Sequence, residues 1–194
     1  MTRVLPELVV IDLEATCDAE QRIVRAAMEI IEIGAVRVDL GTLEIVDRFQ
    51  SYVRPAITPT LTAFCTELTG ITQAQVDVAP WFGEACAQYS AWLGQARDLT
   101  TWGNYDKGQF ERDCGRTGSV DPHTALRHLN LKTIFAKTLG IRSCGLGSAY
   151  KLLKQEMIGR HHSGLDDAVN IARLLTLAPQ FGSDTRGLAL QRDQ

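Results

Sequence analysis

Two carboxylates stand two residues apart near the start of the chain, directly after an apolar run. The run from Leu8 to Ile11 suits a strand that is buried on both faces, and Asp12 and Glu14 follow it. Residues two apart in a strand point to the same face, so both carboxylates are expected to project together. They would lie at a carboxyl end of the sheet, where α/β folds tend to bind ligands. Taken alone, the pattern is common, and a solvated strand end is the better explanation.

A third carboxylate, Asp106, stands just past a second predicted strand at residues 98–102 and opens a predicted helix. Aspartate is favoured at the N-terminus of a helix, so capping alone explains this residue well. Capping and metal binding are compatible at one site. Asp106 is therefore retained as a candidate ligand beside Asp12 and Glu14.

The segment 161–167 contains two histidines and two aspartates, so two pairings with the same spacing compete: His161 with Asp166, and His162 with Asp167. On a helix, Asp166 shares a face with polar residues (Asn170, Arg173), whereas Asp167 shares a face with apolar ones (Ile171, Leu174, Ala178). A carboxylate at the edge of a buried face is costly unless it is paired or binds a metal. The periodicity therefore favours Asp167 as the functional residue, with His162 reaching back over it, and Asp166 as a solvated one.

The combination is more specific than any of its parts. Asp12, Glu14, Asp106 and Asp167 supply four oxygen ligands without a cysteine cluster, which suits magnesium or manganese better than zinc. Two such ions ~4 Å apart can hold the attacking and the leaving oxygen of a phosphodiester displacement. A histidine titrates near neutrality, so His162 can take the proton from the attacking water. The predicted chemistry is metal-dependent phosphodiester hydrolysis.

The elements that must position these residues follow from hydrophobic periodicity. Strands are expected at residues 29–39 and 45–53, and the short turn at 39–42 makes them antiparallel neighbours. Helices are expected at residues 61–68, 85–93, 107–114, 131–139, 146–155 and 165–177. This order predicts an α/β fold, in which a mixed sheet is covered by helices. One domain is expected over residues 1–180, followed by a flexible tail at 181–194.

Composition narrows the class of protein. The chain has 194 residues and a net charge of −3, which argues against coating long nucleic acid and suits binding of one strand end. Its five cysteines form no Cys-x-x-Cys pair, so neither a zinc ribbon nor a disulfide framework is expected. No apolar run approaches the ~18 residues of a membrane span. A cytoplasmic location and no membrane partner are therefore expected.

The three motifs, in this order, resemble those of the DEDDh exonucleases, a branch of the DnaQ-like superfamily. Asp12-Leu13-Glu14 matches the first motif, Asp106 the second, and His162 through Asp167 the third. The resemblance implies a ribonuclease H-like mixed sheet, with an antiparallel three-strand meander plus parallel strands. It also implies a 3′–5′ exonuclease with two Mg²⁺ ions, for which Mn²⁺ is expected to substitute. A homodimer is plausible for this superfamily.

Within the superfamily the chain is similar to the Eri-type exoribonucleases. The similarity rests on residues 12–17, on 49–55, on the Phe-Cys-Thr-Glu-Leu-Thr-Gly-Ile-Thr stretch at 64–72, and on His162-Ser163-Gly164-Leu165 with Asp167. It implies removal of 5′-mononucleotides from the 3′ end of RNA, with single-stranded DNA as a second expected substrate.

The resemblance also assigns roles. Asp12, Glu14 and Asp167 would bind the metal that holds the attacking water, and Asp12 would also bridge to the second metal. Asp106 would support the site through water, and His162 would be the general base. Substrate contacts are implied at Leu13, Ala15, Thr16, Phe64, Leu68 and Tyr105. Phe64 and Tyr105 would stack the terminal base, although Eri-type enzymes usually carry Trp at the position of Tyr105. Glu32 would be either a supporting carboxylate or a residue of an exposed strand face.

Other functions are also consistent with these residues. An oligoribonuclease or a proofreading-like DNA exonuclease would share every motif and differ only in substrate. A general phosphohydrolase would cleave simple phosphodiesters but not shorten oligonucleotides. A binding or regulatory protein that kept the fold would usually have lost a metal ligand, whereas all five motif positions are intact here.

Overall fold

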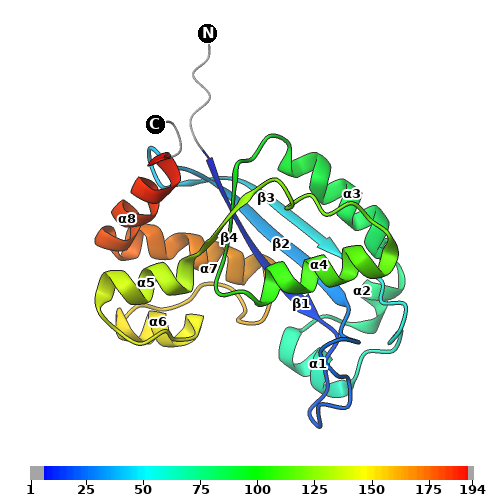
Figure 1. The fold of residues 1–194 in the computed structure, drawn as a ribbon. Helices are drawn as coiled ribbons and strands as arrows, with labels where there is room; N and C mark the ends of the chain where they lie inside the picture. The colour runs from blue at the N-terminus through cyan, green and yellow to red at the C-terminus, as the bar shows by residue number, and fades with distance from the viewer. Residues whose placement is uncertain (1–6, 192–194) are drawn as a thin grey trace.

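A computed structural model describes residues 7–191 and contains a five-stranded sheet in the order β3-β2-β1-β4-β5 (Figure 1). The strands are β1 (Glu7–Ala15), β2 (Ile30–Asp39), β3 (Ile45–Tyr52), β4 (Asp98–Thr101) and β5 (Arg127–Asn130). β1, β2 and β3 form an antiparallel meander, while β4 pairs in parallel with both β1 and β5. The predicted mixed sheet is confirmed. The short strand β5 was not predicted, because its four residues form no apolar run.

Eight helices accompany the sheet in the described part of the chain. They are α1 (Ala63–Thr69), α2 (Gln73–Asp77), α3 (Phe82–Leu93), α4 (Tyr105–Thr117), α5 (Leu131–Leu139), α6 (Leu146–Leu152), α7 (Gly164–Leu177) and α8 (Pro179–Leu190). Helices α5, α7 and α8 lie on one side of the sheet in Figure 1, and α3 and α4 on the other. Between residues 7 and 191, no helix is both long and apolar enough to cross a membrane.

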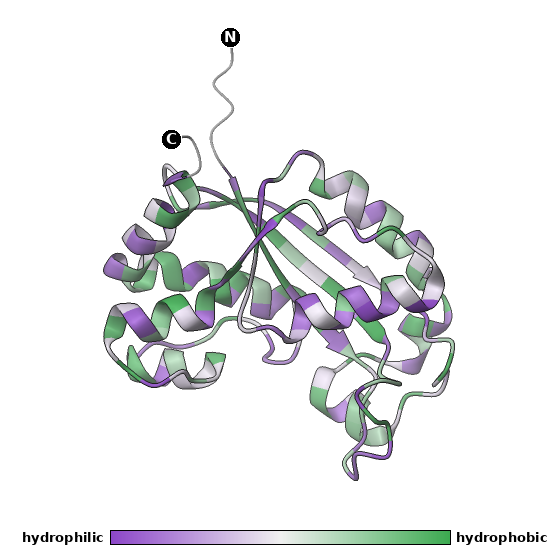
Figure 2. Ribbon diagram, in the orientation of Figure 1, coloured by the Kyte–Doolittle hydropathy of each residue, from purple (hydrophilic) through white to green (hydrophobic). Residues whose placement is uncertain are grey.

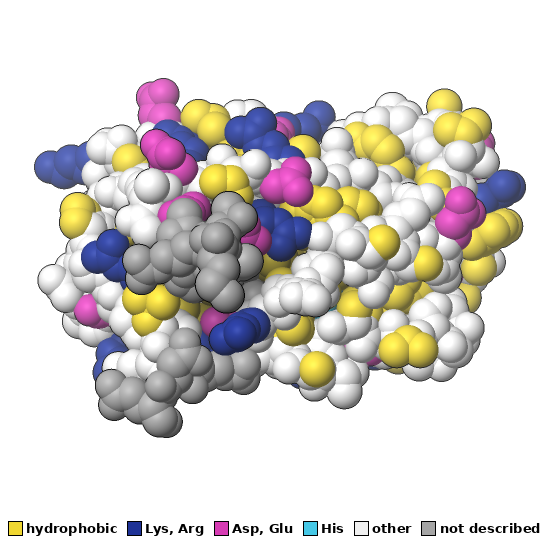
Figure 3. All heavy atoms as spheres, turned by 90° about the horizontal axis from the view of Figure 1, so that it is seen from above, with side chains coloured by type: hydrophobic (Ala, Val, Ile, Leu, Met, Phe, Trp, Pro, Cys, Tyr) yellow, Lys and Arg dark blue, Asp and Glu magenta, His cyan; other side chains and the backbone are white. Residues whose placement is uncertain are grey.

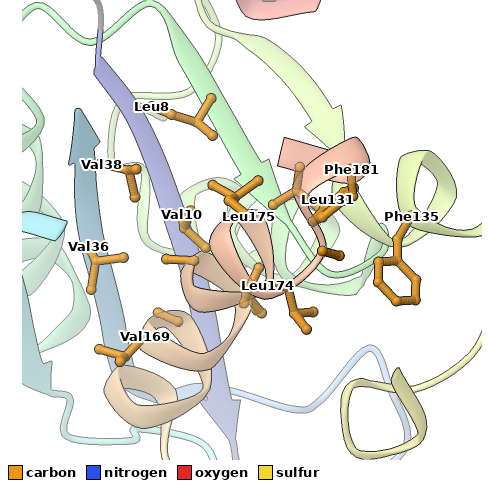
Figure 4. Packing of buried hydrophobic residues seen from close by; sticks show 14 of the residues in the cluster. Leu8, Val10, Val36, Val38, Leu131, Phe135, Val169, Leu174, Leu175 and Phe181 are labelled. Carbon is orange, nitrogen blue, oxygen red and sulfur yellow. The ribbon is translucent and has the colours of Figure 1, made fainter. Parts of the chain in front are cut away.

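Each face of the sheet has its own hydrophobic core. Leu8 and Val10 of β1 pack with Val36 of β2 against α7 (Figure 4). On the other face, Val9 and Ile11 pack against α3 and α4. Hydropathy colouring shows the first half of β1, after Glu7, as hydrophobic and the outer helix α4 as largely hydrophilic (Figure 2). β1 is thus buried on both faces, as its continuous apolar run predicts.

This alternation decides where the carboxylates of β1 point. Side chains on a strand alternate between the two faces, so Asp12 and Glu14 continue the α7 face of Leu8 and Val10. They come after the last core position of the strand, at the carboxyl end of β1. The expectation that the two carboxylates project together is therefore confirmed.

Helix α7 lies unusually close to β2 at its first turn. A Cβ atom added to Gly34 would lie 2.0 Å from the carbonyl carbon of Gly164, and one added to Gly164 would lie 3.0 Å from the carbonyl oxygen of Asp12. Only residues without a side chain permit this approach of backbone to backbone. The contact sets the start of α7, and thus the position of Asp167, one turn further along.

The end of the chain differs from the sequence prediction. Residues 179–190 form helix α8, and Phe181 is fully buried, with its ring 5.3 Å from that of Phe135. The flexible tail predicted from residue 181 is therefore wrong for the described part of it. Residues 192–194 lie outside the described residues.

Gly182 and Pro179, which are residue types typical of loops, fit into helix α8 for physical reasons. A Cβ atom on Gly182 would lie 2.0 Å from the carbonyl oxygen of Leu175, so this glycine lets α8 pack closely against α7. Pro179 occupies the first turn, where its missing N–H is harmless. Residue types that usually indicate a loop are therefore compatible with a packed helix here.

Candidate active site

The five motif residues converge on one pocket at the carboxyl end of β1. Asp12, Glu14, Asp106, His162 and Asp167 all line it. Carboxylate oxygens of Asp12, Glu14 and Asp167 lie within 4.8 Å of one another, close enough to share a metal ion. Three elements contribute, β1, α4 and α7 with the loop before it, and the sheet register and the α7 contact bring them together.

Asp106 holds a different position from the other three carboxylates. It begins the first turn of α4 after the parallel strand β4, and its Oδ1 accepts a hydrogen bond of 3.2 Å from the backbone N–H of Leu13. Asp106 is thus tied to β1 directly between Asp12 and Glu14. It lines the pocket without belonging to the close cluster of the other three, and its supporting role stays a prediction.

The buried carboxylates raise one another's pKa values. Burial is the largest cause at Glu14, whose pKa rises to about 9, with Glu32, Asp167 and Asp106 adding repulsion. Burial and the neighbouring charges of Asp106, Glu14 and Asp167 also raise the pKa of Asp12 well above its ordinary value. Burial raises the pKa of Asp106 to about 6. Such an accumulation of negative charge is costly without compensation, and a divalent cation would supply it.

The structure places the two aspartates of segment 161–167 in different surroundings. Asp167 is buried against the pocket, whereas Asp166 turns away and accepts a hydrogen bond of 2.7 Å from the backbone N–H of Arg160. Asp167 therefore faces the pocket, as helix periodicity predicts, and its functional role stays a prediction. The backbone N–H of His162 donates to Asp167 Oδ2 at 3.0 Å.

His161 is an unexpected member of the site. Its Nδ1 lies 2.9 Å from Asp167 Oδ2, and its ring stacks on that of His162 with centroids 4.1 Å apart. Sequence reasoning had paired His161 with Asp166 and set both aside. His162 has a φ of 64°, a left-handed conformation, and the chain reverses there so that both rings face the pocket.

The pKa of His162 is lowered by burial first and by the neighbouring His161 next, with Asp167 opposing them. A lowered pKa keeps the imidazole neutral at physiological pH. A neutral imidazole is the form that can accept a proton.

Glu32 supports the site from the neighbouring strand. It stands opposite Glu14 in the β1–β2 register and is 1% exposed. Its two carboxylate oxygens accept hydrogen bonds from the backbone N–H groups of Gly164 (2.9 Å) and Leu165 (3.2 Å), the first turn of α7. Of the two readings of this residue, the exposed strand face is therefore wrong. Glu32 caps the helix that carries Asp167.

We expect Glu32→Gln to lower kcat/KM by about 10- to 100-fold, the usual effect of losing a group that orients a metal ligand. The amide retains one acceptor but loses the charge at the helix N-terminus, so Asp167 is held less firmly. Asp39→Asn is the matched control, since Asp39 ends the same strand and caps a turn through Gly41 and Thr42. Steady-state rates and thermal melting of both variants provide the measurement. Equal losses of activity in the two variants would contradict a positioning role for Glu32.

The predicted substrate contacts divide into two groups. Leu13 and Tyr105 line the pocket. The guanidinium of Arg25 also lies over the ring of Tyr105, 5.1 Å from its centroid, in a cation–π contact. Ala15, Thr16, Phe64 and Leu68 do not line it. Thr16 is fully buried, and its hydroxyl oxygen accepts a hydrogen bond from the backbone N–H of Glu29. The roles of all six residues in substrate binding stay predictions.

Three further residues line the pocket without having been expected there: Trp102, Leu146 and His161. Trp102 directly follows β4, and Leu146 begins α6, where its side chain also joins the core. Apolar residues at such positions are ordinary core residues by periodicity. Nothing in the sequence alone distinguishes the wall of a pocket from the core beside it.

Comparison with known proteins agrees with this site. Residues 9–175 match the RNase T family model, described as exonuclease. ERI1 exoribonuclease 3 from Homo sapiens is 36% identical over 180 residues, which cover 87% of this chain and 52% of that protein. The 3′-5′ exoribonuclease 1 of Mus musculus is 34% identical over 188 residues, which cover 91% of this chain and 54% of that protein. The chain thus spans about half the length of the curated relatives it matches.

Among solved structures, the nuclease domain of 3′hExo, a DEDDh family member bound to rAMP, is similar over 95% of both chains. Its TM-score is 0.83 and its sequence is 31% identical. A ribonuclease H-like sheet whose end gathers four carboxylates and a histidine defines the class of DEDDh nucleases, and the chain belongs to this exonuclease family. The resemblance to the Eri-type exoribonucleases is likewise confirmed. The family implies dependence on a divalent metal ion.

Proposed function

We propose that this chain is a 3′–5′ exoribonuclease that hydrolyses RNA from its 3′ end and releases 5′-mononucleotides. The observation that carries the proposal is the convergence of Asp12, Glu14, Asp106, Asp167 and His162 on one pocket. The names of the curated relatives and the rAMP bound to the similar nuclease domain support RNA as the substrate. Action on single-stranded DNA, homodimer formation and a cytoplasmic location are secondary proposals.

The proposal includes two Mg²⁺ ions, with Mn²⁺ able to substitute. The oxygen donors and the mutual repulsion of the carboxylates fit hard divalent cations. Asp12, Glu14 and Asp167 would hold them, and Asp106 would stabilise the second ion from its place beside Leu13. When bound, the ions would neutralise charge on the reacting phosphate and make the attacking water more acidic.

His162 would move the proton in this reaction. A water oxygen would attack the last phosphorus of the strand, and the bond from that phosphorus to the 3′ oxygen of the preceding nucleotide would break. That 3′ oxygen would leave with the bonding electron pair and take up a proton from solvent water. The neutral imidazole of His162 takes the proton of the water, and the terminal residue leaves as a 5′-mononucleotide. The carboxylate of Asp167 accepts a hydrogen bond from the backbone N–H of His162 and thereby holds His162 next to this metal ligand.

The overall charge of the chain is consistent with binding of a strand end. Figure 3 shows the face at the start of β1, opposite the pocket, and there Lys and Arg side chains lie among Asp and Glu side chains. The net charge is −3. Long-range attraction of a polyanion is therefore weak, and the cations in the site would supply the main positive charge.

Cleavage of a 5′-labelled single-stranded RNA and of its DNA analogue, in the presence of Mg²⁺, would test the proposal. We expect a ladder that shortens from the 3′ end, faster for RNA, and a ~10²- to 10⁴-fold lower rate for His162→Ala, as for other general bases. His161→Ala should cost less, since the ring of His161 contacts Asp167, whereas His162 is the proposed base. The reverse ranking would transfer the base role to His161. Intact RNA with both Mg²⁺ and Mn²⁺ would refute the proposed function.

A further inference from the structure

A second hollow adjoins the active-site pocket. It is formed by α6 and the following loop, has a volume of about 540 Å³ and shares two of its walls, Leu146 and His161, with the pocket. We call it the α6 groove. Its remaining polar side chains are Ser148, Lys151, Gln155 and Glu156. The volume lies within the range of small-ligand sites, and nothing in the proposed mechanism uses this space.

The position of the groove matches a need of the substrate. This inference rests on the proposed function, in which the reacting phosphate lies at the carboxylates and the terminal nucleoside lies toward Tyr105. The preceding part of the strand must then leave the carboxylates on another side. In Figure 1, α6 lies to the left of the carboxyl end of β1, and α1 lies below that end. The α6 groove is joined to the pocket through His161 and thus offers a continuous path.

The chemistry of the groove suits a sugar-phosphate chain. Ser148 and Lys151 stand three residues apart on α6, so they share a face of the helix. Lys151 is exposed and forms no ion pair with any residue between 7 and 191, so its ammonium is available for a phosphate. Met157 and Leu146 supply apolar surface for a ribose or a base. Glu156 is the one acidic residue of the lining and would weaken the attraction.

We propose that the α6 groove binds the nucleotide that precedes the scissile bond, with Lys151 and Ser148 contacting its 5′-phosphate. A dinucleotide contains only the phosphate that is cleaved, so it lacks the 5′-phosphate that the groove would bind. A substrate with that phosphate gains the contact, whereas a shorter one reacts without it. Lys151 in this proposal is a substrate-binding residue that takes no part in bond cleavage.

The test compares substrates that differ in the part entering the groove. The p-nitrophenyl ester of thymidine 5′-phosphate and an RNA dinucleotide lack the additional phosphate, whereas an RNA hexamer contains it. Lys151→Ala should lower kcat/KM on the hexamer by roughly 2- to 5-fold, as expected for one exposed charge contact, and leave both short substrates unchanged. The slope of log kcat/KM against log salt concentration should become shallower by about 0.7 for the hexamer.

Two further variants sharpen the comparison. Glu156→Gln should raise kcat/KM on the hexamer and leave the short substrates unchanged, because it removes the acidic neighbour of Lys151 in the groove. Lys137→Ala is the matched control, since Lys137 is an exposed lysine on α5 outside the groove, and it should change none of the three rates.

Each other outcome counts against the groove. Equal losses on long and short substrates would mean that Lys151 acts on the active-site pocket itself. An unchanged hexamer rate and salt slope would show that the strand leaves by another path. If the unmodified protein hydrolysed none of the three substrates, the proposed function would fail first, and the groove with it. Thermal melting of each variant separates these outcomes from loss of folding.

Discussion

Asp167→Asn is expected to abolish cleavage and, at neutral pH, to stabilise the metal-free protein. Asp167 supplies a ligand oxygen to the cluster with Asp12 and Glu14. The amide that replaces it is neutral and cannot balance a divalent cation as a carboxylate does. We expect kcat/KM to fall by at least ~10³-fold, which corresponds to about 4 kcal/mol of transition-state stabilisation.

The gain in stability follows from the repulsion within the site. Burial and neighbouring charges, Asp167 among them, raise the pKa of Glu14 to about 9 from an ordinary value of 4.5. Between these two pH values the folded protein binds more protons than the unfolded chain. The free energy of unfolding of the metal-free protein therefore falls as the pH rises through this window. Removing the charge of Asp167 lowers the pKa of Glu14 and flattens that decline.

Thermal melting at pH 5 and pH 8, with EDTA or with Mg²⁺, provides the measurement. The unmodified protein should melt lower at pH 8 than at pH 5 in EDTA, and Mg²⁺ should raise its Tm at pH 8 by binding only the folded state. Asp167→Asn should show a smaller pH effect and little response to Mg²⁺. Asp166→Asn is the matched control and should behave as the unmodified protein, because Asp166 bonds to Arg160 outside the pocket. A destabilised Asp167→Asn protein in EDTA at pH 8 would contradict a metal-binding role.

The parts of the site that follow from local periodicity were predictable from the sequence. A period of two placed Asp12 and Glu14 on one face, and a period of 3.6 separated Asp167 from Asp166. Both signals depend on the residue and its near neighbours. They remain valid whatever the rest of the chain does, provided that the strand and the helix form.

The parts that depend on tertiary contacts were not predictable in this way. Glu32 is a helix cap for α7 because β2 lies beside β1 in one register, with Glu32 opposite Glu14. His161 contacts Asp167 beside His162, whose φ is positive. Gly182 is a residue type typical of loops, but it lies where α8 packs against α7. In each case the contacting residue is distant in sequence or the backbone conformation is rare. A local sequence pattern therefore does not predict the contact.

Gly34→Ala is expected to have the largest effect on the fold. Gly34 stands opposite Asp12 in the β1–β2 register, and its added Cβ would lie 2.0 Å from the carbonyl carbon of Gly164 and 2.1 Å from the backbone nitrogen of Leu165. Both obstacles are backbone atoms, so no side-chain rotation can relieve the clash. The first turn of α7 must shift away from the sheet, or β2 must bend.

Either displacement affects activity as well as stability. The same turn of α7 receives two hydrogen bonds from Glu32, and these would lengthen as the helix moves outward. Asp167 would move with the helix and leave the cluster formed with Asp12 and Glu14. Since overpacking of a well-packed interior costs ~1–3 kcal/mol and the obstacle here is rigid, we expect a loss of at least ~3 kcal/mol. For a chain of this length that lowers the Tm by roughly 6–12 °C.

Gly115→Ala is the matched control for this substitution. Gly115 lies within helix α4, and an added Cβ there would meet nothing within 4 Å. Alanine removes conformational freedom from the unfolded chain, so this variant should be more stable by ~0.4–1 kcal/mol. Urea unfolding and steady-state rates of both variants would be compared. If Gly34→Ala unfolded like the unmodified protein and retained its activity, β2 and α7 would not be in the close contact that positions Asp167, and the site would require another origin for its geometry.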